Sequence, residues 1–173
     1  MNQHNSGHDV TKESNVERMR LFVEQVQAKG RFELIDSLVH PEFRNHAVEP
    51  GQRSDRAGIG ETVATMHEAF SGLRVEILHC VGAGELVAIH KVLRGRHTGT
   101  WFGVPASGNQ VEFRVMDLVS YRDGQWAEHW AVADAVGLLR QTGGLRDYLD
   151  GSFLWTSHAR AGGPSRVRMA SST

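Results

Sequence analysis

The sequence predicts an α+β domain in which three N-terminal helices pack in a strongly curved, mixed or antiparallel sheet. Apolar residues recur at three- and four-residue intervals over residues 14–70, and they alternate with a period of two over residues 73–134. Helical segments that precede the strands, rather than alternating with them, are typical of α+β domains. The chain has 173 residues, of which 40% are apolar and 23% charged, and this composition fits one globular domain.

That domain is expected to span residues 14–144. Residues 1–13 are polar and aperiodic, as in a disordered lead-in. Residues 145–173 form a C-terminal extension that begins with apolar residues able to dock as an extra element. From residue 156 onward the extension is rich in Ser, Gly and Arg, so this part is expected to be flexible.

The first helix is expected to begin at Ser14 and to end at Gly30. Ser14 and Glu17 have the spacing of a capping box, in which two side chains satisfy backbone N–H groups at the start of a helix. A second, short helix is expected over residues 32–39, because Pro41 disfavours helical conformation in the residue before it.

A short strand is expected at residues 43–48, followed by a polar loop at residues 49–53. A third amphipathic helix comes next, because four apolar residues recur at positions i, i+4, i+7 and i+11. These residues are Ile59, Val63, Met66 and Phe70. The alternation that begins at residue 73 then predicts a strand with Val81 on one face and Cys80 on the other.

Three more long strands are expected, each connected to the one before it in antiparallel order. They lie at residues 86–97, 110–121 and 126–134. A glycine-bearing turn at 82–85 precedes the first, and a loop at 99–109 precedes the second. Asp123 and Gly124 form a two-residue hairpin signal before the last strand, because both residues tolerate the positive φ angles that such turns need.

Charge and cysteine content exclude several kinds of partner. The 19 Lys and Arg residues are balanced by 20 Asp and Glu residues, so neither nucleic acid nor an anionic membrane is expected to bind. Cys80 is the single cysteine, which excludes an intramolecular disulfide and a thiolate zinc site. No secretory leader or apolar run of about 20 residues is present, and a cytoplasmic location is expected.

One carboxylate lies on an otherwise apolar strand face. Asp117 shares its face with Val111, Phe113, Val115 and Val119. Because an unpaired buried carboxylate is costly, this pattern is typical of an acid/base residue in a pocket. The alternative is a structural carboxylate bound to a neighbouring histidine or to the backbone.

The last strand carries an imidazole among small residues. Ala127, His129, Ala131 and Ala133 share one face, which leaves room for a ligand. Antiparallel pairing about the Asp-Gly turn places Asp117 near His129 or Ala131, so an acid/base pair is expected there. The alternative is that His129 is a solvent-facing edge residue.

Ten histidines raise the question of metal binding. No HxH or HExxH motif is present, and His90 and His97 lie on opposite strand faces, so no metal site is expected. Glycine-rich nucleotide-binding motifs are also missing, and we expect no cofactor.

Four motifs of the chain resemble those of the SnoaL-like polyketide cyclases, a family of the nuclear transport factor 2-like superfamily. They are GRHTG (95–99), FGVPA (102–106), YRDGQWAEHW (121–130) and GLLRQTG (137–143). The resemblance covers Ser14 to Gly144 and implies a cone-shaped α+β barrel. It also implies a homodimeric, cofactor-independent cyclase or isomerase-like enzyme that acts on an apolar, polyketide-type carbonyl substrate in secondary metabolism, as in antibiotic biosynthesis.

The resemblance also implies catalytic residues. In the aldol-type cyclases an Asp two residues after the strand His removes a proton next to a carbonyl, and Ala131 replaces it here. Asp117, His129 and Asp134 are therefore the expected catalytic residues, although Asp134 could instead cap the following turn. The relatives that are epoxide hydrolases need an arginine where Val115 stands, which disfavours that activity.

Further residues are expected to bind the substrate. They are His46, His97, Trp101, Val104, Phe113, Val115 and Ala131. His46 or His97 would stabilise the enolate. A second copy is expected to cover the convex sheet face, on which Trp126 and Trp130 are predicted to lie. The alternatives are a non-catalytic small-molecule-binding protein, a subunit of a larger assembly, or a hydroxylase-like or epoxide-hydrolase-like relative.

Overall fold

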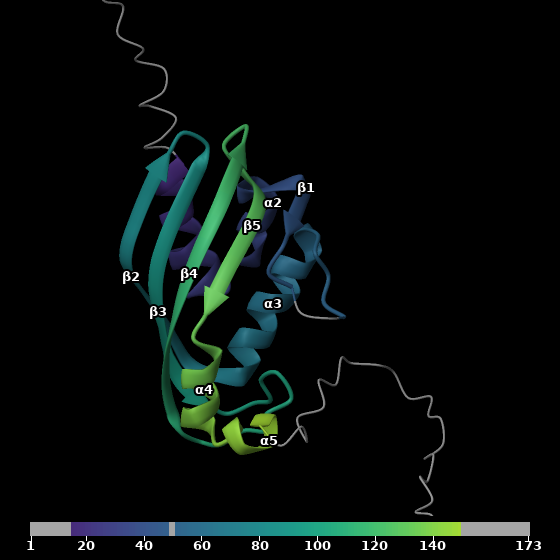
Figure 1. Cartoon of the computed structure of the whole chain (residues 1–173). Helices are drawn as coiled ribbons and strands as arrows, with labels where there is room; N and C mark the ends of the chain where they lie inside the picture. The colour runs from purple at the N-terminus through teal and green to yellow at the C-terminus, as the bar shows by residue number, and fades with distance from the viewer. Residues whose placement is uncertain (1–14, 49–50, 150–173) are drawn as a thin grey trace, which may run out of the picture.

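A five-stranded mixed sheet organises the part of the chain that the computed structural model describes, residues 15–48 and 51–149 (Figure 1). The strands are β1 (Val39–Asn45), β2 (Phe70–Ala83), β3 (Leu86–His97), β4 (Gln110–Arg122) and β5 (Gln125–Ala133). Their order is β1-β5-β4-β3-β2, with β1 parallel to β5 and the other neighbours antiparallel. Because β1 and β2 remain as two edges, the sheet does not close into the expected barrel.

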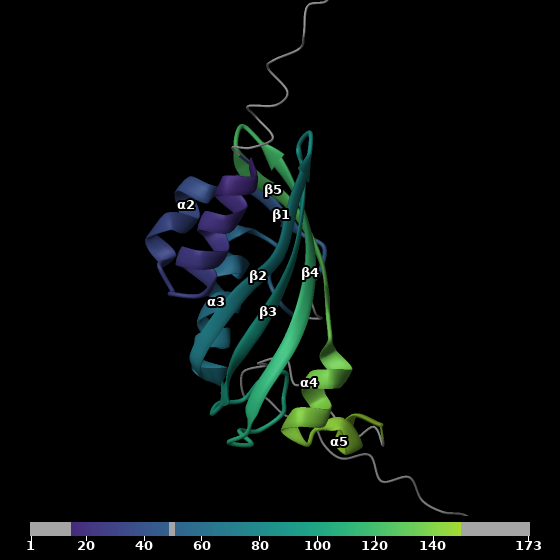
Figure 2. The same ribbon diagram turned by 90° about the vertical axis from the view of Figure 1, so that its left-hand side faces the viewer.

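Helices precede and follow the long strands. They are an α-helix over residues 15–21 that continues as the π-helix η1 (Phe22–Gln27), the 3-10 turn η2 (Phe32–Leu34), α2 (Ile35–Leu38), α3 (Arg56–Ala69), α4 (Ala135–Thr142) and α5 (Leu145–Leu149). The helices that precede β2 cover one face of the sheet, whereas α4 and α5 lie at one end of the molecule (Figure 2). The predicted capping residue Ser14 lies outside the described residues. Among those residues no helix has the length and apolar character needed to span a membrane.

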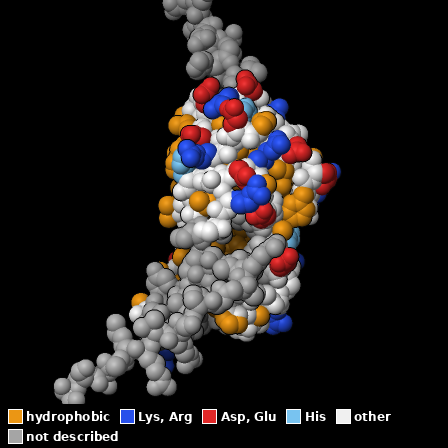
Figure 3. All heavy atoms as spheres, turned by 90° about the vertical axis from the view of Figure 1, so that its right-hand side faces the viewer, with side chains coloured by type: hydrophobic (Ala, Val, Ile, Leu, Met, Phe, Trp, Pro, Cys, Tyr) orange, Lys and Arg blue, Asp and Glu red, His pale blue; other side chains and the backbone are white. Residues whose placement is uncertain are grey.

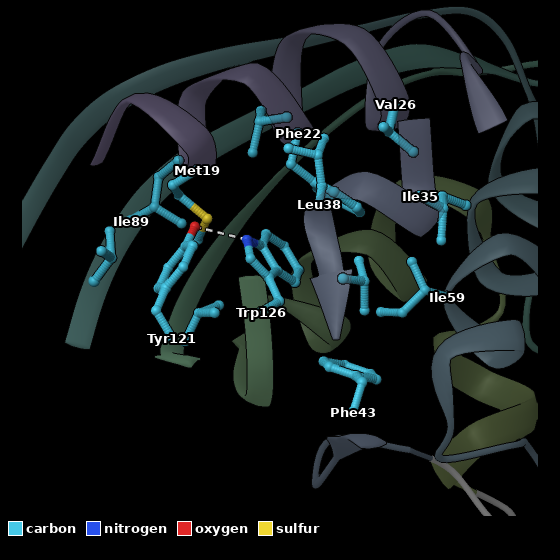
Figure 4. Packing of buried hydrophobic residues seen from close by; sticks show 14 residues of the cluster. Met19, Phe22, Val26, Ile35, Leu38, Phe43, Ile59, Ile89, Tyr121 and Trp126 are labelled. Atoms are coloured by element: carbon cyan, nitrogen blue, oxygen red, sulfur yellow. Dashed lines mark hydrogen bonds between the residues drawn. The ribbon is translucent and has the colours of Figure 1, made fainter. Parts of the chain in front are cut away.

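The main core lies between the first helix and the sheet (Figure 4). Phe22 packs on the indole of Trp126 with ring centroids 4.0 Å apart, and the indole N–H of Trp126 donates to the hydroxyl of Tyr121 at 2.7 Å. Trp126 is only 2% exposed, so its predicted place on the outer face is wrong. The pairing of β4 with β5 shifts between Ser120 and Tyr121 and leaves Ala127 of β5 as an extra residue, so Trp126 and His129 on either side of it point to the same face.

A bulge in β2 makes the predicted faces of two of its residues wrong. The pairing of β2 with β3 shifts between Ile77 and His79. Cys80 therefore packs against the core, whereas Val81 is 63% exposed, although the alternation predicted strict period two. His79 is exposed as well, and its side chain does not reach the interior.

The first strand also begins earlier than predicted. β1 starts at Val39 and includes Pro41, which ends the preceding helix as expected but is tolerated here because β1 is an edge strand. Asn45 ends the strand and pairs in register with His129 of β5. This parallel pairing places Asn45 of the first strand beside the last strand.

Candidate functional site

A cavity of about 460 Å³ opens between the sheet, α3, α4 and the loop that follows β3. Most of its wall is apolar, with Met66, Leu93, Phe113 and Leu138 among the lining residues. The polar side chains of the wall come mainly from η1, β1, β3, β4 and β5. They include Gln27, Asn45, Lys91, Asp117 and His129.

Asp117 lies at the centre of these polar residues. It projects from β4 and is only 4% exposed. Its Oδ1 is 3.1 Å from Nε2 of His129, and its Oδ2 is 2.7 Å from Nζ of Lys91. The expected contact between Asp117 and His129 is thus present, although the Cα partner of Asp117 on β5 is Ala131.

Lys91 was not among the site residues predicted from the sequence. It projects from β3, is 3% exposed, and donates through Nζ to Oε1 of Gln27 at 2.8 Å. The signal was available, because Lys91 is the one charged residue on a strand face that otherwise carries Val87, Ile89 and Leu93. Gln27 ends the π-helical turn, and π-helical turns are frequent at functional sites.

The orientation of His129 is set by Asn45. Oδ1 of Asn45 accepts a hydrogen bond from the backbone N–H of Ala47 at 2.9 Å, which identifies this atom as the oxygen. Nδ1 of His129 lies 2.9 Å from the same oxygen and therefore donates its proton to it. The Nε2 side of the ring is directed to the carboxylate of Asp117.

The charges around Asp117 determine its protonation. Burial is the largest influence and by itself raises the pKa of this carboxyl group. The ammonium of Lys91 and the hydrogen bond from His129 more than offset burial, so the pKa of Asp117 lies below its ordinary value. Asp117 is therefore ionised at neutral pH.

His97 and Trp101 line an apolar part of the cavity. Nδ1 of His97 accepts from the backbone N–H of Ser107 at 3.3 Å. Burial lowers the pKa of His97, with a backbone contact to Gly99 acting in the opposite direction, so the ring is neutral. Both rings contact Phe70, with centroid distances of 5.5 Å for His97 and 5.2 Å for Trp101.

Asp134 lies on the cavity rim and caps α4. Its Oδ1 accepts from the backbone N–H of Gly137 at 2.8 Å, and its side chain is exposed. The capping alternative is therefore realised, while the cavity lining also includes this carboxylate. The remaining residues of the predicted lining in the cavity wall are Val104, Phe113, Val115 and Ala131.

His46 is not among the residues that line the cavity. Its ring stacks on Trp130 with centroids 4.8 Å apart, and its Nε2 lies 3.7 Å from Oε1 of Glu128. Asn45, the last residue of β1, reaches the cavity, whereas His46 lies in the bend that follows the strand.

Within residues 15–48 and 51–149, no three His, Cys, Asp or Glu side chains are grouped so that they could hold a metal ion.

Comparison with models of protein families identifies one family. The family model described as SnoaL-like polyketide cyclase matches residues 17–142. The nogalonic acid methyl ester cyclase of Streptomyces nogalater is 29% identical over 119 residues, which cover 66% of this chain and 87% of that protein.

Two solved structures extend the comparison. TsrD from Streptomyces laurentii superimposes with a TM-score of 0.71 at 26% identity, covering 77% of this chain and 97% of TsrD. IdmH from Streptomyces antibioticus has a TM-score of 0.65 at 26% identity, covering 75% of this chain and 98% of IdmH.

Proposed function

Because the chain belongs to the SnoaL-like polyketide cyclase family, we propose that it is a cofactor-independent cyclase that closes a ring in an apolar, polyketide-type carbonyl substrate. The observation that carries this proposal is the buried carboxylate of Asp117, held between Lys91 and His129 in the wall of a largely apolar cavity. A site of this kind combines space for a hydrophobic ligand with one positioned base and two donors.

In the proposed reaction Asp117 removes a proton from the carbon next to a carbonyl group. The resulting enolate carbon attacks a second carbonyl carbon of the same molecule, which forms the ring bond and leaves an alkoxide. A proton returned from the site converts the alkoxide to a hydroxyl group. Lys91 and His129 stabilise the negative charge that passes from carboxylate to enolate oxygen to alkoxide.

The position of Asp117 accounts for the alanine at 131. The resemblance predicts a catalytic Asp on β5 where Ala131 stands, and the strand register pairs Ala131 directly with Asp117 of β4. Side chains of paired residues project from the same face of a sheet. We therefore propose that the base is supplied by the neighbouring strand, while the small Ala131 leaves space for the substrate.

The proposal is tested by proton exchange and by ring closure. Purified protein is incubated in D₂O with nogalonic acid methyl ester, the compound in the relative's name. NMR then follows deuterium uptake at the carbon next to the carbonyl, and chromatography follows the cyclised product. Asp117→Asn is expected to lower both rates at least 100-fold, since a positioned base contributes roughly 10² to 10⁴. Asp36→Asn, which changes an exposed carboxylate, is the matched control and is expected to keep the wild-type rates.

A binding protein without catalysis is the second candidate. The loss of the predicted carboxylate at Ala131 favours it. This function predicts that the ligand is recovered unaltered after long incubation and takes up no deuterium beyond the protein-free rate. Equal exchange rates for wild-type protein and Asp117→Asn would decide for this candidate and against the cyclase.

A further inference from the structure

We infer that the indole N–H of Trp101 and the Nε2–H of His97 form a second binding subsite, at the apolar end of the cavity, which binds a neutral carbonyl group of the ligand. This subsite is distinct from the polar residues around Asp117. The inference rests on the proposed function only for the location of the ligand in the cavity. It does not depend on turnover, because it concerns how the ligand is bound.

The two donors lie far from the polar end of the cavity. His97 and Lys91 both line the cavity and belong to the same strand, β3. His97 follows Lys91 by six residues, which corresponds to about 20 Å between the two Cα atoms at about 3.3 Å per residue of an extended strand. Leu93, which lines the cavity between them, is apolar and buried. A ligand group bound at His97 is therefore a different group from the one bound at Lys91.

The indole N–H of Trp101 is a buried donor among apolar side chains. Trp101 is 7% exposed, and its Nε1 has no hydrogen-bond partner in the part of the chain that the structure describes. The surrounding hydrophobic cluster includes Leu93 and Leu138. Trp101 and Phe70 meet edge-on with ring centroids 5.2 Å apart, and an aromatic ring is a weaker acceptor than an oxygen atom. Because a buried donor without an acceptor is costly, this N–H group favours a ligand that brings one.

The tautomer of His97 supplies the second donor. The backbone N–H of Ser107 donates to Nδ1, so Nδ1 carries no proton. Burial lowers the pKa of His97, so the ring is neutral at pH 7 and its one N–H proton lies on Nε2. Among the described residues Nε2 has no hydrogen-bond partner, and the side chain is fully buried. The rings of His97 and Trp101 both contact Phe70, so the two donors lie in the same part of the cavity wall.

A strained turn holds Trp101 in the cavity wall. The backbone N–H of Trp101 donates to Val104 at 3.0 Å, and the carbonyl group of Trp101 accepts from Val104 at 2.9 Å. Phe102 and Gly103, between them, have positive φ angles of 47° and 79°. Positive φ is uncommon for a residue other than glycine, and such strain clusters at active sites and ligand clamps. The turn therefore fixes the position of Trp101 relative to the cavity.

The surroundings of the two donors select a neutral acceptor. Lys91 is the one lysine or arginine in the described cavity wall, and it is paired with Asp117 at the other end. An anionic group next to Trp101 would be buried without a counter-charge, which is costly. A hydroxyl group would bring a proton of its own, which apolar side chains do not accept. A ketone or ester carbonyl accepts hydrogen bonds and donates none, so it is the expected group.

NMR of the wild-type protein tests where a carbonyl group binds. The probes are 9-fluorenone, which carries a carbonyl group, and fluorene, which has the same skeleton without it. Contacts with the ring of Phe70 in nuclear Overhauser spectra assign the side-chain N–H protons of Trp101 and His97. Hydrogen bonding to a carbonyl oxygen moves an N–H proton downfield, so both protons are expected to move further with fluorenone than with fluorene. Equal shifts with the two probes overturn the inference, and a difference confined to Trp101 removes His97 from the subsite.

A matched pair of variants measures the contribution of the indole N–H. Equilibrium dialysis gives the Kd of fluorene divided by the Kd of fluorenone, a ratio in which the contribution of the shared skeleton cancels. Trp101→Phe keeps an aromatic ring but removes the N–H, and is expected to lower this ratio roughly three- to tenfold, the effect of one hydrogen bond. Trp130→Phe makes the same substitution on the outer sheet face and should leave the ratio unchanged. An unchanged ratio in folded Trp101→Phe overturns the role of Trp101. If this variant does not fold, the NMR shifts of the wild-type protein still decide.

Two further outcomes separate this inference from its alternatives. 9-Fluorenol, which carries a hydroxyl group on the same skeleton, is expected to bind the wild-type protein more weakly than fluorenone, and equal affinity overturns the carbonyl class. Deuterium exchange into nogalonic acid methyl ester, measured on the same protein samples, tests catalysis separately. Carbonyl-selective shifts without exchange contradict the cyclase and support the subsite, whereas exchange together with equal shifts does the reverse.

Discussion

At the scale of single residues, the site depends on a buried lysine next to a buried carboxylate. The ammonium of Lys91 lies 2.7 Å from Oδ2 of Asp117, and both side chains are almost completely enclosed. Removing one partner of such a pair leaves the other charge buried without compensation, which is strongly destabilising. The ammonium of Lys91 is therefore expected to hold Asp117 in its ionised form.

The pH dependence of proton exchange should report this coupling. The folded-state pKa of Asp117 lies below its ordinary value, so the ionised form stabilises the fold above the ordinary value and this contribution is lost as pH falls through the folded pKa. In Lys91→Met, burial is no longer opposed by the ammonium, and the pKa of Asp117 should rise. The acid limb of the exchange rate should accordingly move to higher pH, measured by NMR between pH 3 and 8. An unchanged acid limb in a folded variant would contradict the coupling.

The predictability of these residues differs for physical reasons. Asp117 and His129 were predictable, because strand alternation and a two-residue hairpin turn bring them together over a short distance in sequence. Lys91 was predictable by the same pattern as Asp117, because it is a charged residue on an otherwise apolar strand face. The contact of Asn45 with His129 has no such pattern, because a parallel strand pairing joins the two residues across 84 positions of the sequence. Local sequence patterns do not encode such a contact.

At the scale of secondary structure elements, two β-bulges limit what alternation predicts. Cys80 and Trp126 lie on faces opposite to the predicted ones, because one extra residue in a strand interrupts the alternation of side chains on either side of it. Hairpin turns were predictable from the positions of glycine residues, and most strand limits were predictable from the period-two alternation of apolar residues. The bulges were not, since they depend on contacts between strands.

The helix α4 offers a test of what Asp134 does. If its carboxylate is mainly a cap, Asp134→Ala should lower the free energy of unfolding by about 1 kcal/mol, measured by urea denaturation. Asp134→Asn keeps a capping oxygen and should retain wild-type stability and exchange rate. Gly137 supports this interpretation, because a Cβ at that position would collide with the carboxylate. Loss of exchange in a stable Asp134→Asn protein would instead identify a catalytic role.

At the scale of the whole molecule, the two faces of the sheet have different environments. The inner face holds the core and the cavity, under the helices. The outer face of β4 and β5 presents exposed apolar side chains in register, with Leu118 paired to Trp130 and Met116 paired to Val132. On the side shown in Figure 3, by contrast, acidic and basic side chains are interspersed with apolar ones.

We propose that a second copy covers this outer face, as the resemblance predicts. Contiguous exposed apolar side chains of this kind usually mark an interaction surface. Val132 is 76% exposed, so Val132→Lys should place a charge in the interface and shift a dimer toward monomer. Light scattering coupled to size exclusion at micromolar concentration measures the shift, with Val136→Lys on α4 as the control that should remain dimeric. Wild-type protein that elutes as a monomer would contradict the dimer. A dimer unaffected by Val132→Lys would place the interface on another surface.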